Sequence, residues 1–165
     1  MDVSTLYDED ICAWAEQQAA SLRRLAASRR DLPNELDLEN IAEEIEDVGH
    51  AQRSAAESFI RMIFVHLIKL AAAPQAPSAK HWRAEITTFH NDLLFRLTPS
   101  MPWRIDLDRV WRLALKEARV RLQAEDVEPD RAFWEGLKER PIEFEALVPA
   151  DFDVDAALEH FLARA

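Results

Sequence analysis

Hydrophobic and small residues recur every three or four positions between residues 37 and 70, a rhythm typical of a helix packed along one seam. The rhythm continues through Gly49, so we expect one long helix rather than two. Asp37 stands at the expected N-cap, and Pro74 follows the end of the pattern. The positions predicted to point inward are Ile41, Ile45, Val48, Gln52, Ala55, Phe59, Met62, His66 and Leu70.

A helix is also predicted before this stretch. Asp8 is its expected N-cap, since acidic residues follow it and the helix dipole favours them in a first turn. Arg29 and Arg30 mark its end, where the dipole favours cations. Its predicted inner stripe consists of Ile11, Trp14, Gln18, Leu22 and Leu25.

Two more long helices are predicted after the proline-containing linker AAAPQAPSA. One begins at Pro77 and Ser78 and stops before Pro99, because proline interrupts a helix. The other covers residues 107–123. Their apolar positions are Trp82, Ile86, Phe89, Leu93 and Leu97 in the first, and Val110, Trp111, Ala114, Leu115 and Ala118 in the second.

The tail is divided by prolines, and we expect short helices over 132–139 and 154–162, the latter capped by Asp153. Four long helices joined by short loops indicate an all-α, up-down helical bundle with short C-terminal helices. We expect residues 1–124 to form the bundle core. Residues 125–165 are predicted to be a short helical extension packed on the same domain.

Composition and charge narrow the classes of partner. A net charge of −11 over 165 residues argues against duplex nucleic acid and against an anionic membrane surface, since both require a basic surface. No stretch reaches the roughly 18 apolar residues of a membrane span. No secretion signal is recognised, which predicts a cytoplasmic location. The single Cys12 excludes an intramolecular disulfide framework and a cysteine-rich zinc site.

Several of these residues form an ordered pattern: Asp8, Trp14, Leu36, Asp37, Glu43 to Asp47, Ser58, His66 to Lys69, Pro74, Trp82, Ile86, Pro99 and Ser100. The pattern resembles a bacterial family known as domain-of-unknown-function family twenty-nine. The likeness spans roughly Tyr7 to Leu122, with departures at Leu70, His81 and His90. The resemblance implies an all-helical cytoplasmic protein and leaves the activity open.

An acidic cluster lies at the start of the long predicted helix. Carboxylates three and four residues apart share a helix face and can hold Mg, Mn or Zn together with a histidine. In the heptad frame only Glu44 flanks the seam, so the alternative is a solvated acidic face. EEIED is also similar to EExxE, the first half of the pattern of helical nucleotide pyrophosphohydrolases, but no ExxD pair stands at the expected distance downstream. The metal-ligand candidates are Glu43, Glu44, Glu46, Asp47 and His50.

Histidines on two predicted helices and one tryptophan are further candidates. His66 falls in an apolar run, where a buried imidazole needs hydrogen-bond partners. It is therefore a core histidine in a structural hydrogen bond, or else a metal ligand or general base. His81 and His90 would approach His66 or the acidic cluster if the next helix is antiparallel, as the short linker favours. Trp103 is the best candidate for an exposed partner contact.

Two functions follow from these observations. The first is a protein-interaction or binding module that presents a helix face or groove to a protein partner or a second copy. The alternative is a divalent-metal-dependent hydrolase of nucleotides or phosphate esters, with the acidic cluster as ligands and His66 or His90 nearby as catalytic residues. The two hypotheses differ in whether the carboxylates converge on one point inside the fold.

Overall fold

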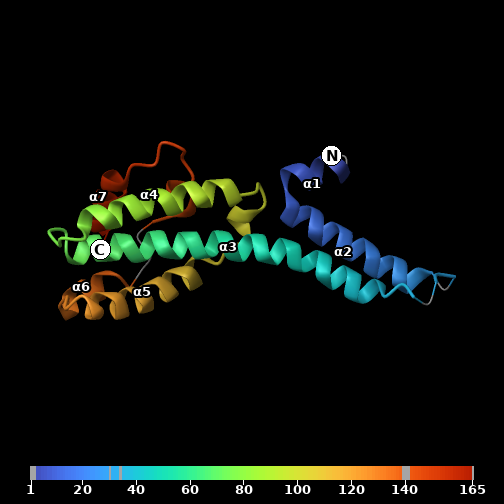
Figure 1. Cartoon of the computed structure of the whole chain (residues 1–165), viewed down its shortest axis with the longest axis horizontal. Coiled ribbons are helices and arrows are strands. Elements are labelled where there is room, and N and C mark those ends of the chain that lie inside the picture. The colour runs from blue at the N-terminus through green and yellow to red at the C-terminus, as the bar shows by residue number, and fades with distance from the viewer. Residues whose placement is uncertain (1–2, 30, 34, 139–141, 165) are drawn as a thin grey trace. The chain divides into compact units, whose positions relative to one another are not determined.

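The computed structural model describes residues 3–29, 31–33, 35–138 and 142–164. Within these ranges the chain forms seven α-helices and two short 3₁₀ helices and contains no strand, which confirms the predicted all-helical fold (Figure 1). The elements are α1 (Val3–Glu9), α2 (Ile11–Ser28), α3 (Leu38–Ala72), α4 (Ala79–Arg96), η1 (Met101–Trp103), α5 (Leu107–Ala124), α6 (Arg131–Gly136), η2 (Phe144–Ala146) and α7 (Val154–Arg164).

The long predicted helix is confirmed as one element. Helix α3 runs for 35 residues without a break at Gly49. It begins after Asp37, whose Oδ1 accepts a hydrogen bond from Asn40 N at 3.2 Å, and it ends before Pro74. Helices α4 and α5 also lie close to their predicted bounds, because the prolines and the N-cap Asp106 delimit them.

The prediction for the N-terminus was wrong. Asp8 belongs to the separate short helix α1, and the N-cap of α2 is Asp10, whose Oδ1 accepts from Ala13 N at 3.0 Å. The backbone of Asp10 leaves the helical region with φ at −148°, which separates the two helices. At the other end, α2 stops at Ser28, and Arg30 lies outside the described residues.

The short C-terminal helices are present where the pattern predicted them. Helix α6 ends at Gly136, and the predicted end at Glu139 lies outside the described residues. Helix α7 begins at Val154 after the predicted cap, since Asp153 Oδ1 accepts from Ala156 N at 2.8 Å.

The chain divides into two compact units. The first comprises Met1–Ala55 and Arg96–Ile105, and the second comprises Ala56–Phe95 and Asp106–Ala165. Helix α3 contributes its first half to one unit and its second half to the other.

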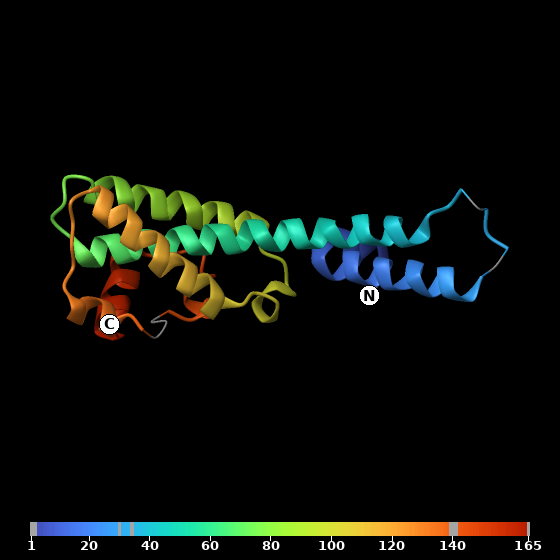
Figure 2. The ribbon, with the colours of Figure 1, turned by 90° about the horizontal axis from the view of Figure 1, so that it is seen from below.

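In the first unit, α2 and the first half of α3 run antiparallel and side by side (Figures 1 and 2). Small residues fill their contact. A Cβ added to Gly49 would lie 3.3 Å from Ala15 Cβ and 3.4 Å from Cys12 Cα, so the two backbones approach closely. The thiol of Cys12 donates a hydrogen bond to the Gly49 carbonyl at 3.4 Å. The buried residues of this contact include Cys12, Ala15, Ala19, Ala42 and Gly49.

The predicted inward stripes of this unit were wrong in orientation. Ile41 and Val48 of α3 are 40% and 48% exposed, and Leu25 of α2 is 36% exposed. Residues in a helix advance by about 100°, so the observed contact through Ala42 and Gly49 is rotated about 90° from the predicted seam. The close contact of small residues decides the orientation and leaves the larger aliphatic side chains outside it.

In the second unit the predicted seams are largely confirmed. Helices α4 and α5 run along the second half of α3 (Figures 1 and 2). Residues 63–70 of α3 are all buried, so every face of the helix is covered there. The ring of Trp111 of α5 packs edge-on against that of Phe64, with ring centroids 5.3 Å apart. Its Nε1–H donates a hydrogen bond to the Leu137 carbonyl at 3.2 Å. The buried predicted positions of α4 and α5 are Trp82, Ile86, Leu93, Val110, Trp111, Ala114 and Ala118.

The close contact at Gly49 predicts the effect of enlarging this residue. Gly49→Leu is expected to lower the unfolding free energy by about 1–3 kcal/mol, because overpacking against Ala15 and Cys12 exceeds the gain in helix propensity of about 1 kcal/mol. Urea denaturation followed by circular dichroism measures the change. The matched control is Ala51→Leu on the exposed side of the same helix, with an expected change within about 0.5 kcal/mol. Equal effects of the two substitutions would contradict the tight contact.

Candidate functional site

The first unit presents a contiguous apolar surface, which we call the hairpin face. On α2, Leu22 and Leu25 lie about 90° around the helix axis from the side that contacts α3. On α3, Ile41 and Val48 lie about 90° from the side that contacts α2. Both rotations have the same sense when each helix is viewed from its N-terminus. In an antiparallel pair, equal rotations of this kind bring both rows to the same side of the pair. The hairpin face is therefore formed by Leu22, Leu25, Ile41, Ile45 and Val48, which are half-buried or exposed.

An ion pair on the opposite side of the hairpin supports this geometry. Arg23 and Glu46 are rotated from the helix contact in the other sense, by about 50° each. Their side chains meet there, with Arg23 Nη2 2.6 Å from Glu46 Oε2. The hydrogen bond from Arg23 lowers the pKa of the Glu46 carboxyl. One side of the hairpin is thus apolar and the other carries a salt bridge between the helices.

Both limits of the hairpin face are occupied by contacts within the unit. Tyr7 of α1 packs edge-on against Trp14, with ring centroids 4.8 Å apart. Gln52 Nε2 donates to the Arg96 carbonyl at 3.1 Å, and Arg96 Nη1 donates to Gln52 Oε1 at 3.2 Å. The stretch between these contacts keeps its aliphatic side chains accessible.

Of the residues proposed as metal ligands, Glu43, Glu46, Asp47 and His50 share one face of α3, and Glu44 points away from it. Glu43, Glu44 and Asp47 are exposed, while Glu46 is held by Arg23. His50 Nδ1 lies 3.5 Å from Asp47 Oδ1. Over the ranges that the structure describes, no group of three or more His, Cys, Asp or Glu side chains is arranged to hold a metal ion. A metal-binding role for this cluster stays a prediction.

His66 is 1% exposed and contacts a carboxylate, as expected for a buried histidine. Its Nδ1–H donates to the Met62 carbonyl at 2.7 Å, because a carbonyl can only accept. Its Nε2 lies 3.0 Å from Glu85 Oε2 on the antiparallel helix α4, and His81 Nε2 lies 3.4 Å from the same oxygen. Burial lowers the pKa of His66, and the Met62 carbonyl and Glu85 only partly offset this effect.

A second buried ionisable residue lies one turn along α3. Lys69 is buried, its Nζ lies 2.7 Å from Glu125 Oε1, and it sits 4.3 Å from the centre of the Trp82 ring. Sequence reasoning missed Lys69, Glu85 and Glu125 as parts of a charged cluster. The spacing of four residues between His81 and Glu85 was an available signal for one of its pairs.

His90 is buried beside the C-terminal segment rather than beside His66. Its Nε2–H donates to the Leu147 carbonyl at 3.0 Å, and its ring stacks on Phe152 with centroids 4.5 Å apart. Burial lowers the pKa of His90, although the Leu147 carbonyl acts in the opposite direction. The catalytic role predicted for His66 or His90 would require access that neither buried ring has in this fold.

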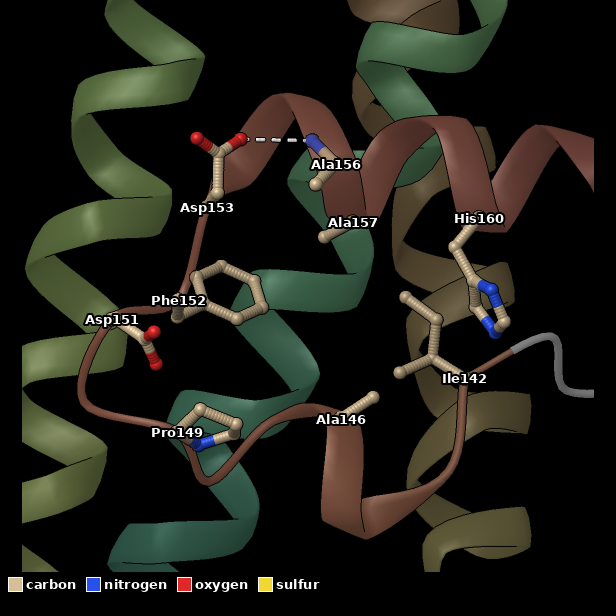
Figure 3. Close-up of a pocket in the computed structure, with 9 residues that line it drawn as sticks. All are labelled: Ile142, Ala146, Pro149, Asp151, Phe152, Asp153, Ala156, Ala157 and His160. Atoms are coloured by element: carbon tan, nitrogen blue, oxygen red, sulfur yellow. Dashed lines mark hydrogen bonds between the residues drawn. The ribbon is translucent and has the colours of Figure 1, made fainter.

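Phe152 also lines a cavity of about 340 Å³ between α7 and the segment that precedes it (Figure 3). The lining is mainly apolar, with Ile142 and Ala157 among its side chains. Its polar members are Asp151, Asp153 and His160. The volume lies at the lower end of the range for small-molecule sites, so the cavity suits a small apolar group.

Asp10 joins two distant parts of the first unit. This buried carboxylate accepts hydrogen bonds from Ala13 N, from Ser100 N at 2.7 Å and from Ser100 Oγ at 2.9 Å. Burial alone would raise the pKa of Asp10, but these hydrogen bonds outweigh burial and lower it. Ser100 supplies two of the three donors, so this contact ties the start of α2 to the loop before η1.

Trp103 has the exposure that the sequence suggested. It lies at the end of η1 in the first unit and is 74% exposed. Its role as a partner contact stays a prediction.

These features define an all-helical bundle protein, and within its described part no helix combines the length and apolarity needed to cross a bilayer. Residues 6–151 match the family described as domain of unknown function DUF29, and the chain belongs to this family, which confirms the resemblance. The crystal structure of an α-helical protein of unknown function from Rhodospirillum rubrum is similar, with 42% identity, a TM-score of 0.83, and 93% of this chain and 95% of that chain covered. No curated protein matches the sequence significantly.

The contacts of Asp10 predict a large cost for its removal. Asp10→Ala is expected to destabilise the protein by about 1–3 kcal/mol at neutral pH, because it leaves buried donors of Ser100 unpaired. The pKa of Asp10 is lower in the folded chain than its unfolded value of 3.8. The stabilisation by Asp10 is therefore fully present above pH 3.8 and is lost as the pH falls through the folded pKa. Chemical denaturation over a pH series measures it. The control is Asp106→Ala at the exposed N-cap of α5, which should lower the unfolding free energy by only about 1 kcal/mol. An equal loss for the two variants would contradict the role of burial at Asp10.

The environment of His66 predicts its titration. The imidazole should titrate below its ordinary pKa of 6.5, and Glu85→Gln should lower that pKa further, because it removes the carboxylate that favours the imidazolium. At a pH between the unfolded His66 pKa of 6.5 and the lower folded pKa, His66 is protonated in the unfolded chain but neutral in the folded chain. The unfolding free energy should therefore fall as the pH falls through this window. Long-range proton–nitrogen NMR of the ring measures the pKa and the Nδ1–H tautomer. A pKa above 6.5, or a rise in Glu85→Gln, would contradict the interpretation.

Proposed function

We propose that this chain is a helical protein-interaction module whose binding surface is the hairpin face. The observation that carries the proposal is the exposure of Leu25, Ile41 and Val48 together on one side of the α2–α3 pair. Single exposed aliphatic residues are common on soluble proteins and need no explanation. A contiguous group on two adjacent helices, with charged residues at its edges, is instead typical of an interaction site.

The energetics support the same function. Burying a leucine, isoleucine or valine side chain contributes about 1.5–3 kcal/mol, so even partial burial of several residues of the hairpin face provides useful binding energy. The face contributes little to the interior of the unit, because small residues make the contact between α2 and α3. Its large aliphatic residues are thus better explained by a partner than by the fold.

The hydrolase alternative receives less support from the described residues. Its candidate ligands Glu43, Glu44 and Asp47 are exposed, Glu44 points away from the other two, and Glu46 is engaged by Arg23. Its candidate catalytic residues His66 and His90 are buried and hydrogen-bonded to carbonyls. No contact of these groups favours a catalytic function over the interaction module.

Polar substitutions on the hairpin face test the proposal. The double variant Ile41→Ser/Val48→Ser should weaken partner binding at least tenfold, about 1.4 kcal/mol or more, because it removes the central aliphatic contacts. The immobilised full-length protein would be used for quantitative capture from cell extract of the source organism. Sedimentation of the purified protein would report self-association in parallel.

Helix α5 offers a matched control. Leu113 and Val120 are also exposed and also seven residues apart, so Leu113→Ser/Val120→Ser makes the same chemical change away from the hairpin face. This control should bind like the wild type. Both variants should keep the wild-type circular dichroism spectrum. The proposal would be wrong if capture and self-association were the same for both double variants.

A further inference from the structure

We propose that the carboxylate of Glu85 is part of a pH-responsive switch in the second unit. It binds His66 while the pair holds one proton more than a neutral imidazole and a carboxylate, and it turns to the exposed His81 when that proton is lost. All three residues belong to the second unit, so the inference goes beyond the hairpin face and does not depend on it.

The hydrogen bonds of His66 fix where its protons lie. Its Nδ1 lies 2.7 Å from the Met62 carbonyl, which can only accept, so Nδ1 carries a proton. A neutral imidazole has a single ring proton, and its Nε2 is then a bare lone pair. Glu85 Oε2 lies 3.0 Å from this Nε2, and an ionised carboxylate also can only accept. Two acceptors at this distance repel each other, so the contact requires a proton between them.

The pair of His66 and Glu85 therefore takes up and releases one proton as a unit. With the proton bound, the imidazolium donates a charge-assisted hydrogen bond to the carboxylate. Without it, Nε2 offers Glu85 no donor. The remaining proton of His66 cannot move to Nε2, because Nδ1 would then face the Met62 carbonyl without a proton. The carboxylate must therefore find its donor elsewhere.

His81 is a donor within reach of Glu85. It stands one turn before Glu85 on α4, and its Nε2 lies 3.4 Å from the same Oε2. The side chain of His81 is 71% exposed, so water can serve its other ring nitrogen and leave Nε2–H for the carboxylate. The side chain of Glu85 is 34% exposed, which gives its carboxylate room to turn from the buried ring to the exposed one.

The surrounding charges set the direction of the switch. The other ionisable residues around the pair are Lys69 of α3, His81 of α4, Glu117 and Arg121 of α5, and Glu125 after α5. Burial is the largest cause that lowers the pKa of His66, and Lys69 and Arg121 add to it. The Met62 carbonyl and Glu85 oppose these causes without outweighing them. The pair therefore holds its proton only below pH 6.5, so acid closes the contact and neutral pH opens it.

The switch changes how α4 is held against α3. His66 lies within residues 63–70, where α3 is buried on every side, so its bond to Glu85 links the interior stretch of α3 to α4. When the carboxylate turns to His81, both partners belong to α4 and the link between the helices is lost. The two helices thus share one charge-assisted bond in acid that they lack at neutral pH.

Nuclear magnetic resonance of the full-length protein tests the inference between about pH 4 and about pH 8, which covers the charge change of histidine. The nitrogen shifts of the ring report which nitrogen of His66 carries a proton. Nuclear Overhauser effects report which ring the Glu85 methylene groups contact. As the pH rises through the folded pKa of His66, the cross-peak between Glu85 and His66 should weaken several-fold, and the cross-peak between Glu85 and His81 should strengthen.

Glu85→Gln separates the switch from a contact that is only structural. An amide can donate to the bare Nε2 of a neutral His66 and can accept from the imidazolium. The cross-peak to His66 should therefore persist at every pH in this variant, while the pKa of His66 falls. A structural contact of Glu85 would show no such difference between the wild type and the variant.

Two further variants test the alternative partner and the effect of charge alone. His81→Leu removes the donor to which the released carboxylate turns, so it should raise the pKa of His66. Asp92→Asn is the matched control, since it removes an exposed carboxylate of the same helix about 10 Å further along the axis. This control should titrate like the wild type.

Each outcome is decisive once circular dichroism shows that the variants are folded. Loss of the cross-peak in the wild type, together with its persistence in Glu85→Gln, supports the switch. A neutral His66 that carries its proton on Nε2 would overturn it, because the contact would then need no extra proton. A cross-peak between Glu85 and His66 that keeps its intensity above the pKa would overturn it as well.

Discussion

The first unit depends on the close approach of α2 and α3 at Gly49. A side chain at this position would press on Ala15 and Cys12, so the two helices can lie this near only because glycine and alanine fill the contact. Close backbones leave no room for leucine, isoleucine or valine between them. These side chains must lie beside the contact, and the sense of rotation places them on one side of the pair. The hairpin face is therefore a direct consequence of the small-residue contact.

The second unit is built in the opposite way, with large side chains around α3. Ile60, Phe64 and Leu67 are fully buried, and aromatic residues of α5 and α7 complete the interior. Ionisable groups enter such an interior only with partners. Glu85 lies within hydrogen-bond distance of His66, and Glu125 lies as close to Lys69, so α4 and the segment after α5 are positioned by charge as well as by apolar packing. These pairs explain how two ionisable residues fit within a helix that is covered on every side.

Family membership and a similar structure at 42% identity show that the fold is shared, but a fold alone does not define a function. The functional inference therefore rests on surfaces. On the hairpin, the exposed aliphatic residues Leu25, Ile41 and Val48 favour an interaction with a partner. In the C-terminal part, the cavity beside Phe152 has a mainly apolar lining, which does not specify a particular ligand.

The sequence by itself determined the elements, because helix periodicity, prolines and N-caps are local signals. It predicted α3 as one helix, the limits of α4 and α5, and the caps Asp37 and Asp153. It also predicted that a buried His66 would need hydrogen-bond partners. Only the tertiary structure decided which side of a helix faces inward. In the second unit the periodic stripe and the interior coincide, whereas in the first unit the closest packing is between small residues, which turns Ile41 and Val48 outward. The contacts of His66 with Glu85 and of Asp10 with Ser100 likewise join segments that are far apart in the chain. No local sequence pattern predicts which distant segments come into contact.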